Sequence, residues 1–422
     1  MNASDTPSAE ATDVGQSLRR PWPPATISCC QCGRFSQEEF FRCCAGCRGD
    51  VEFDYPHRAR RLPATARSMW DFGDRLPVRD SRNIVSLGEG MTPLLSACAF
   101  RECSVFWKNE GANPTGSQKD RAVSVAISVA REHGFERVVT ASTGSVGLAC
   151  AAYCARAALS CVVLVPTGTP VERLRPIMAF GAKVVLVDTT FEHIERLLAT
   201  LDPLRWYQAS TIQRRNCYQS EGPKTIAYEI VLQMGRAPDW LVVPVGGGGT
   251  LFGIWKGFDE LQRDGLIDKM PRMLGVHARS FNFLERVGIV ATIDETEVAP
   301  LIPDEREATV LRNLKHGFPP DAHSAMRALH TTDGRITSVT DEEALSAQLT
   351  FARREGIFCE PSAAVVLVAV ARAIGQGWVA PGESVVGIVT GSGLREPGVL
   401  SNLEPHYAAT IDEAELERIV RE

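Results

Sequence analysis

The chain has 422 residues, of which 44% are hydrophobic and 23% are charged, as in an ordinary globular protein rather than a disordered or fibrous one. Its formal net charge is −6, from 45 basic and 51 acidic side chains. This balance excludes the strongly basic surface of a general nucleic-acid-binding protein and gives no reason to expect a membrane surface as partner. Small-molecule chemistry is the better expectation.

The 13 cysteines are an odd number, and no apolar signal segment precedes them. We therefore expect a reducing, cytoplasmic compartment rather than a secreted disulfide framework. The apolar stretch Ala363–Ala371 is far shorter than the roughly 20 residues that cross a bilayer. Six cysteines fall between Cys29 and Cys47, so their distribution tells more than their number.

Residues 1–28 lack apolar periodicity, which is typical of a flexible leader. The cysteine-rich segment 29–55 follows, and a connector with proline and arginine then runs from about 56 to 82. After it, strand-like and helix-like patterns alternate almost to the end. We expect residues 56–400 to form the main unit and residues 401–422 a C-terminal tail or helix.

The alternation of patterns predicts an α/β fold with parallel sheets and helices on both faces. Apolar spacing and end signals predict helices over 120–133, 147–158, 171–180 and 191–201. Short apolar runs predict strands over 137–141, 161–165, 183–187, 240–245, 274–277 and 385–389.

Open α/β sheets bind ligands in the loops that follow the carboxyl ends of their strands. Four segments with polar residues fall at loops between predicted strands and helices, and the first of them, Asn113–Arg121, contains Lys119. Ser117 and Asp120 form a capping-box pattern that would put Lys119 in the first turn of a helix. The positive end of the helix dipole disfavours an ammonium there. Lys119 is therefore expected to be available as the neutral amine that Schiff-base chemistry requires.

Three further loops offer polar groups at the same kind of position. Ser142, Thr143, Gly144 and Ser145 precede an alanine-rich helix, and their amides and hydroxyls suit a carboxylate. A tetraglycine loop can turn several backbone N–H groups toward a phosphate. Because this loop lacks the Walker lysine and the GxGxxG spacing, a phosphorylated cofactor other than a nucleotide is favoured. The residues of this loop are Gly246, Gly247, Gly248, Gly249 and Thr250. The last loop, 390–393, presents the hydroxyls of Thr390 and Ser392 without a carboxylate.

Seven segments occur in the order seen in threonine synthase, and the match spans about Leu87 to Pro397. These segments are 88–94, 113–121, 142–147, 221–225, the tetraglycine loop, 360–364 and 390–394. The chain therefore resembles the threonine synthase-like family of fold type II pyridoxal phosphate (PLP) enzymes. The resemblance implies two parallel-sheet α/β lobes, the smaller one, about 124–215, being inserted in the larger, and a homodimer.

The resemblance also implies the roles of the candidate residues. Lys119 would bind PLP covalently and then act as the general base for the α-proton of the substrate. Gly246 to Gly249 and Thr250 would hold the cofactor phosphate, Ser145 would lie near its 3-hydroxyl, and Ser142, Thr143 and Gly144 would bind the substrate carboxylate. Thr390, with Ser392 as second candidate, would face the pyridine nitrogen, where a hydroxyl favours elimination and replacement over transamination.

The family activity would be the conversion of O-phosphohomoserine to threonine plus phosphate, but several positions depart from the pattern. Gln219 stands where the family tends to carry an arginine for the substrate's phosphate; it remains the substrate-binding candidate, and Arg214 and Arg215 could compensate. Ser145 replaces the usual asparagine, and Ser392 the common histidine. A β-replacing or dehydratase relative acting on O-phosphoserine, O-acylserine, or threonine and serine remains an alternative. So does an inactive binding protein that uses the cysteine segment.

Two CxxC pairs in the amino-terminal segment indicate a metal site. Cys29 and Cys32 form the first pair, Cys44 and Cys47 the second, with eleven residues between them. Four thiolates in this arrangement suit tetrahedral Zn²⁺, and a segment this short cannot fold on an apolar core alone. We expect a small zinc-ribbon-like segment over 29–55, as threonine synthase-like sequences often have at this end.

Overall fold

The structure is a computed structural model. It describes residues 26–396 except 31, 37–42, 45, 48, 56–60, 101–102, 143, 291–292, 294–297 and 304–306, and beyond them only Leu403, Arg418 and Val420. Residues 1–25 of the expected leader and nearly all of the expected C-terminal tail or helix lie outside the described residues. None of the described helices is long and apolar enough to cross a bilayer.

A three-stranded antiparallel sheet lies at the amino-terminal end of the described chain. Its strands β1 (Thr26–Cys29), β2 (Phe35–Ser36) and β3 (Val51–Asp54) are ordered β2-β1-β3. Strand β1 begins three residues before the expected start of this segment at residue 29, and its Thr26 pairs with Asp54. This ribbon packs against the main unit, where the Tyr55 hydroxyl donates to Glu221 Oε2 at 2.7 Å.

The larger lobe contains a six-stranded sheet with the order β12-β11-β10-β13-β5-β4. All neighbours pair in parallel except β4, which is antiparallel to β5. Its strands are β4 (Leu94–Ser96), β5 (Ser104–Asn109), β10 (Trp240–Pro244), β11 (Arg272–Ala278), β12 (Arg335–Val339) and β13 (Ser384–Val389). The predicted α/β architecture with parallel strands is confirmed.

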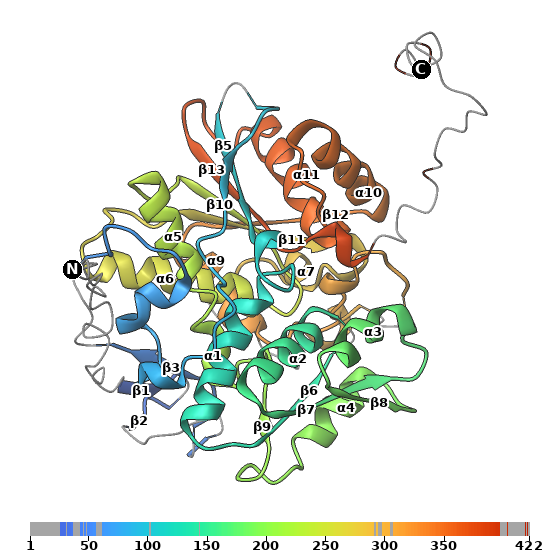
Figure 1. Cartoon of the computed structure of the whole chain (residues 1–422). Helices are drawn as coiled ribbons and strands as arrows, with labels where there is room; N and C mark the ends of the chain where they lie inside the picture. The colour runs from blue at the N-terminus through green and yellow to red at the C-terminus, as the bar shows by residue number, and fades with distance from the viewer. Residues whose placement is uncertain are drawn as a thin grey trace, which may run out of the picture.

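Helices cover both faces of the large sheet because its central strands are apolar on both sides. Leu241 and Val243 of β10 share a core with α5 (Thr225–Met234), α6 (Gly249–Arg263) and α9 (Ala322–Thr331). Trp240 and Val242, which point the other way, share a second core with α10 (Asp341–Thr350) and α11 (Pro361–Gly375). Figure 1 shows α10 and α11 on one side of this sheet and α5 and α6 on the other.

The smaller lobe is built on a four-stranded parallel sheet with the order β8-β7-β6-β9. Its strands are β6 (Arg137–Ala141), β7 (Ser160–Pro166), β8 (Lys183–Val187) and β9 (Tyr207–Gln208), and its helices are α2 (Ser145–Ala157), α3 (Val171–Ala179) and α4 (Phe191–Leu198). These strands lie inside the range 124–215 and interrupt the order of the large sheet, since β5 precedes them and β10 follows. In Figure 1 they form the green lobe.

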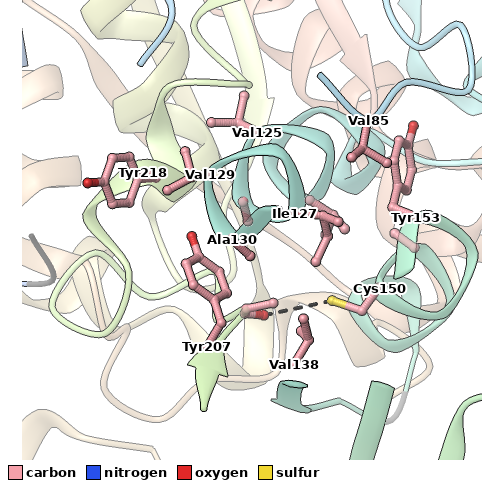
Figure 2. Packing of buried hydrophobic residues seen from close by; sticks show 14 of the residues in the cluster. Val85, Val125, Ile127, Val129, Ala130, Val138, Cys150, Tyr153, Tyr207 and Tyr218 are labelled. Atoms are coloured by element: carbon pink, nitrogen blue, oxygen red, sulfur yellow. Dashed lines mark hydrogen bonds between the residues drawn. The ribbon is translucent and has the colours of Figure 1, made fainter. Parts of the chain in front are cut away.

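Helix α1 (Lys119–Glu132) connects the lobes, and its residues 121–130 are buried. Ile127, Val129 and Ala130 pack with Val138 of β6 and Cys150 of α2 (Figure 2). The Cys150 thiol also reaches the Ala209 carbonyl at 3.9 Å. A helix buried on all sides fixes the position of its first residue, Lys119, relative to both sheets.

The remaining helical elements are short. The helix α7 spans Phe283–Val287, a π-helical turn spans Phe351–Glu355, and 3-10 turns span Met69–Arg75, Ser81–Asn83, Glu110–Ala112, Cys217–Ser220, Arg279–Phe281, Ala299–Leu301, Arg312–Leu314 and Gly393–Arg395.

Candidate active site

A cavity of about 840 Å³ lies where the loops after the strands of both lobes meet. It is bounded by the loops that follow the carboxyl ends of β6, β7, β8 and β10, as expected for open parallel sheets. The sequence-predicted residues that line it are Lys119, Ser142, Gly144, Ser145, Gly246, Gly247, Gly248, Gly249, Thr250 and Thr390. Gln219 and Ser392 are not among the lining residues, and Thr143 lies outside the described residues.

Lys119 lies in the first turn of α1, as its motif predicted, but the predicted capping box forms only in part: the Ser117 hydroxyl accepts from the Lys119 amide at 3.3 Å. The N-cap position is Gln118, which makes no side-chain cap, and the Asp120 carboxylate instead accepts hydrogen bonds from the Thr115 amide (3.0 Å) and hydroxyl (2.8 Å). Burial lowers the pKa of Lys119, while Asp321 and Glu360 act in the opposite direction. Desolvation therefore favours the neutral amine.

A buried ionic network holds the first turn of α1. Arg121 Nε lies 2.7 Å from Glu110 Oε2, and its Nη1 lies 2.5 Å from Glu229 Oε1. Lys108 of β5 reaches the same Glu229 at 2.6 Å, and all four side chains have no solvent exposure. Because these charges are paired from β5, α1 and α5, the network joins the lysine-bearing helix to the large lobe.

The tetraglycine loop opens α6 and needs its glycines. A Cβ on Gly246 would lie 2.4 Å from the Asn313 carbonyl oxygen, and one on Gly249 would lie 2.6 Å from Asp321 Oδ2. Gly248 has φ +96°, in the left-handed region that other residues rarely adopt. The first amides of a 15-residue helix thus border the cavity, and such amides attract anions.

Gln118 and Asp321 tie this loop to its surroundings, the first through its side chain and the second through its backbone amide. Gln118 Nε2 donates to the Thr250 hydroxyl at 3.1 Å, which links the neighbour of Lys119 to the loop. The Asp321 amide donates to the Gly247 carbonyl, and its carboxylate accepts from the Gln213 amide, each at 2.8 Å. Burial raises the pKa of Asp321 to about 7. The loop is therefore fixed by hydrogen bonds on both sides.

The loop before α2 forms the facing wall of the cavity. The Ser142 hydroxyl accepts from the Gly144 amide at 3.2 Å, and Gly144 is the N-cap of α2 without a side-chain cap. The uncapped amides leave room for a carboxylate at this helix end. The Ser145 hydroxyl accepts from Arg395 Nη1 at 2.7 Å.

The loop after β13 places its two predicted hydroxyls differently. Thr390 lines the cavity, whereas Ser392 caps a 3-10 turn and accepts from the Leu394 amide at 3.3 Å. Glu360, the N-cap residue of α11, is buried and also lines the cavity. Its pKa is raised by burial, and Arg395 opposes that shift.

Gln219 lies behind the tetraglycine loop. It is buried, its Nε2 donates to Gln213 Oε1 at 3.1 Å, and the same atom lies 2.8 Å from where a Cβ on Gly249 would be. The two nearby arginines do not line the cavity either, and Arg214 lies 3.7 Å from Asp50 in a half-exposed ion pair. Gln219 therefore contacts Gln213 behind the loop and does not line the cavity.

Sequence reasoning missed Arg173, Glu195 and Arg312, which all line the cavity. Burial raises the pKa of Glu195 to about 7, and Arg215 opposes that shift. A signal existed for the first two residues. Arg173 lies in the first turn of α3, and Glu195 is the fifth residue of α4. These helices follow β7 and β8, and in a parallel sheet the loops before them meet the same edge as the loops after β6 and β10.

The four cysteines of the ribbon come together. The sulfur atoms of Cys29, Cys32, Cys44 and Cys47 all lie within 4.8 Å of one another. Cys29 Sγ is 3.4 Å from Cys47 Sγ, and Cys32 Sγ is 3.6 Å from Cys44 Sγ. Tetrahedral bonds of about 2.3 Å to one ion place sulfurs at this spacing, so the cluster could hold a metal.

Comparison with known proteins agrees with this geometry. The family model described as pyridoxal-phosphate dependent enzyme matches residues 85–391. Threonine synthase of Mycobacterium tuberculosis is 38% identical over 336 residues, covering 77% of this chain and 88% of that protein. Threonine synthase of Methanocaldococcus jannaschii is 34% identical over 411 residues, covering 93% and 99%.

Among solved structures, maize serine racemase matches with a TM-score of 0.59 at 17% identity, covering 78% of this chain and 91% of that chain. This likeness concerns the fold, which is that of the fold type II enzymes. The family match and the relatives above cover most of the chain, including every loop of the cavity. The chain belongs to the pyridoxal-phosphate dependent enzymes and is threonine synthase-like within them.

Proposed function

We propose that the chain converts O-phosphohomoserine and water into threonine and inorganic phosphate. This proposal is supported by the arrangement of a desolvated lysine, the glycine-rich start of α6 and the uncapped start of α2 around one cavity. The two relatives named threonine synthase support the choice of substrate.

The residues present fit PLP. A Cβ on Gly246, Gly248 or Gly249 would lie within 2.8 Å of a neighbouring atom, so these positions require glycine. The amides at this helix start suit a phosphate. Lys119 would hold the cofactor covalently, Gly246 to Thr250 its phosphate and Thr390 its pyridine nitrogen. Bound PLP would withdraw electrons from the substrate's α-carbon and so acidify the neighbouring C–H bonds.

The chain's own groups would perform the remaining tasks. Ser142 and Gly144 would orient the substrate through its carboxylate. Burial lowers the pKa of the Lys119 amine and so favours its neutral form, whose Nζ can take up the α-proton. Asp321 and Glu360 favour the protonated form in turn, which would stabilise the lysine after it has accepted the proton.

The test is to offer O-phosphohomoserine and O-phosphoserine separately to PLP-loaded protein and to measure phosphate release and threonine formation. Threonine from the first substrate is the expected result. Phosphate release from O-phosphoserine alone would instead favour a β-replacing or dehydratase reaction and would contradict this proposal.

We further propose that Cys29, Cys32, Cys44 and Cys47 bind a structural zinc ion, which the spacing of their sulfurs supports. Metal analysis of the purified chain should give one zinc per chain, and replacing Cys44 by serine should remove it. Retention of the zinc in that variant would count against this ligand set.

Two further expectations remain proposals. The family resemblance supports a homodimer, which light scattering on the purified chain would measure. The cysteine usage supports a cytoplasmic location, which fractionation of cells that express the tagged chain would measure.

A further inference from the structure

Two arginines that no motif indicated lie on the wall of the cavity. Arg173, in the first turn of α3, and Arg312, in the 3-10 turn Arg312–Leu314, both line it. Arg173 Nη2 lies 3.0 Å from the position that a Cβ on Gly144 would occupy. Its guanidinium therefore lies against the loop that we propose for the substrate carboxylate.

A third arginine adds to the positive charge at this wall. Arg395 donates to the Ser145 hydroxyl at 2.7 Å, and its Nε is buried without a hydrogen-bond partner in the part of the chain that the structure describes. Arg312 and Arg395 both lower the pKa of Arg173, although burial is the larger cause. Arg173 thus lies close enough to both other guanidinium groups to be repelled by them.

Two carboxylates partly balance these arginines. Glu396 Oε1 lies 2.5 Å from Arg173 Nη2, and Glu360 Oε2 lies 3.7 Å from Arg395 Nη1. The three arginines and these two carboxylates leave an excess of one positive charge, and Lys315 and Glu195, which also line the cavity, offset each other in this count. A bound anion would neutralise this excess and use the guanidinium donors that Glu396 leaves open.

The residues indicated by the sequence do not offer this anion a site. Gln219 is buried and bonded to Gln213, and Arg214 lies 3.7 Å from Asp50 away from the cavity. The tetraglycine loop is the proposed site of the cofactor's own phosphate. Among the described arginines, those at the α3 wall are therefore the best placed for a second phosphate.

We propose that Arg173, assisted by Arg312, binds the phosphate of the amino-acid substrate while the neighbouring loop binds its carboxylate. This inference rests on the proposed function, because it assigns the leaving group of that reaction. Arg173 is then a specificity residue: it selects phosphorylated over unphosphorylated amino acids, as a guanidinium can bind phosphate through two parallel hydrogen bonds.

The test uses the PLP-loaded full chain and two ligands that do not react further. One is the phosphonate analogue of O-phosphohomoserine, in which a methylene group replaces the ester oxygen, and the other is norleucine. Binding is followed by the change in the visible absorption of the cofactor. Arg173→Leu should weaken phosphonate binding about 100-fold and leave norleucine binding unchanged, and Arg173→Lys should recover it to within about tenfold.

Two further variants complete the experiment. Arg175→Leu removes the same charge from an exposed position on α3, and both ligands should bind it as they bind the unaltered chain. Arg312 is exposed, so Arg312→Leu should fold normally and weaken phosphonate binding about tenfold. The affinity for PLP should stay the same in both cavity variants, since the cofactor's phosphate is bound elsewhere.

Equal losses for the two ligands, or no loss of phosphonate binding, would overturn the inference. So would an unaltered chain that binds norleucine as tightly as the phosphonate. If Arg173→Leu does not fold, Arg312→Leu alone decides by the same criteria. A chain that binds the phosphonate through Arg173 but forms no threonine would refute the proposed function and leave this subsite standing.

Discussion

The two walls of the cavity differ in the chemical groups that they present. The large-lobe wall presents Lys119 and the backbone of the tetraglycine loop, next to strands β10 and β13 in which every residue is buried, together with Glu360 and Arg312. The small-lobe wall carries Arg173 and Glu195 on helices that follow β7 and β8, strands with partly exposed residues. Backbone groups on a fully buried sheet suit the cofactor that the whole family shares. Charged side chains on the small-lobe wall suit discrimination between substrates.

The largest effect should follow from altering Lys119 on the large-lobe wall. In Lys119→Ala the cofactor loses its covalent attachment and the α-proton loses its base, so turnover should fall on the order of 10⁴-fold. The visible absorption of the attached cofactor should vanish with it. Turnover within tenfold of the unaltered chain would show that another group takes the proton.

The ionic network behind that wall should matter for stability. Arg121→Met leaves Glu110 and Glu229 buried with part of their positive charge removed, so the free energy of unfolding should fall by about 3–5 kcal/mol. Urea denaturation measures it. Arg131→Met, at an exposed position of the same helix, is the control and should change little. Equal effects of the two variants would contradict the role of the network.

A smaller effect is expected from adding one methyl group to the tetraglycine loop. In Gly246→Ala the new Cβ meets a backbone oxygen at 2.4 Å, which cannot swing away, so PLP binding should weaken by about 1–3 kcal/mol. Gly247→Ala is the matched control: its Cβ would meet the Pro320 ring at the longer distance of 3.3 Å, so PLP binding should weaken less. Titration with PLP compares the two, and a greater loss in Gly247→Ala would refute the steric argument.

The smallest effect concerns Glu195 on the small-lobe wall. Its pKa is about 7 in the folded chain, above the ordinary value of 4.5, so its ionisation costs stability as the pH rises from about 4.5 to 7. Glu195→Gln should therefore be about 1 kcal/mol more stable than the unaltered chain at pH 8 and equal to it near pH 4. Thermal unfolding at both pH values tests this, with exposed Glu172→Gln as control. A difference that does not vary with pH would exclude titration of Glu195 as its cause.

Local patterns were sufficient for most of the secondary structure. The strands over 137–141 and 183–187 have the predicted bounds, and the helix bearing Lys119 begins one residue before its predicted start. The capping box formed only in part, because the Asp120 carboxylate also bonds to Thr115, and the Ser117 hydroxyl accepts from the Lys119 amide rather than from the Asp120 amide. Short polar side chains have several backbone partners within reach, and the spacing of residues does not decide among them.

The sequence by itself determined the α/β fold and the family, and it indicated Lys119 and the tetraglycine loop, which line one cavity in the structure. Glycines and apolar runs carry these features, since each reports a local backbone requirement. Only the tertiary structure decided which charged side chains face the cavity. Arg173, Glu195 and Arg312 lie far apart in the chain, and Gln219, which the sequence did indicate, is buried behind the loop. Side-chain direction depends on how the lobes pack, and no local pattern records that packing.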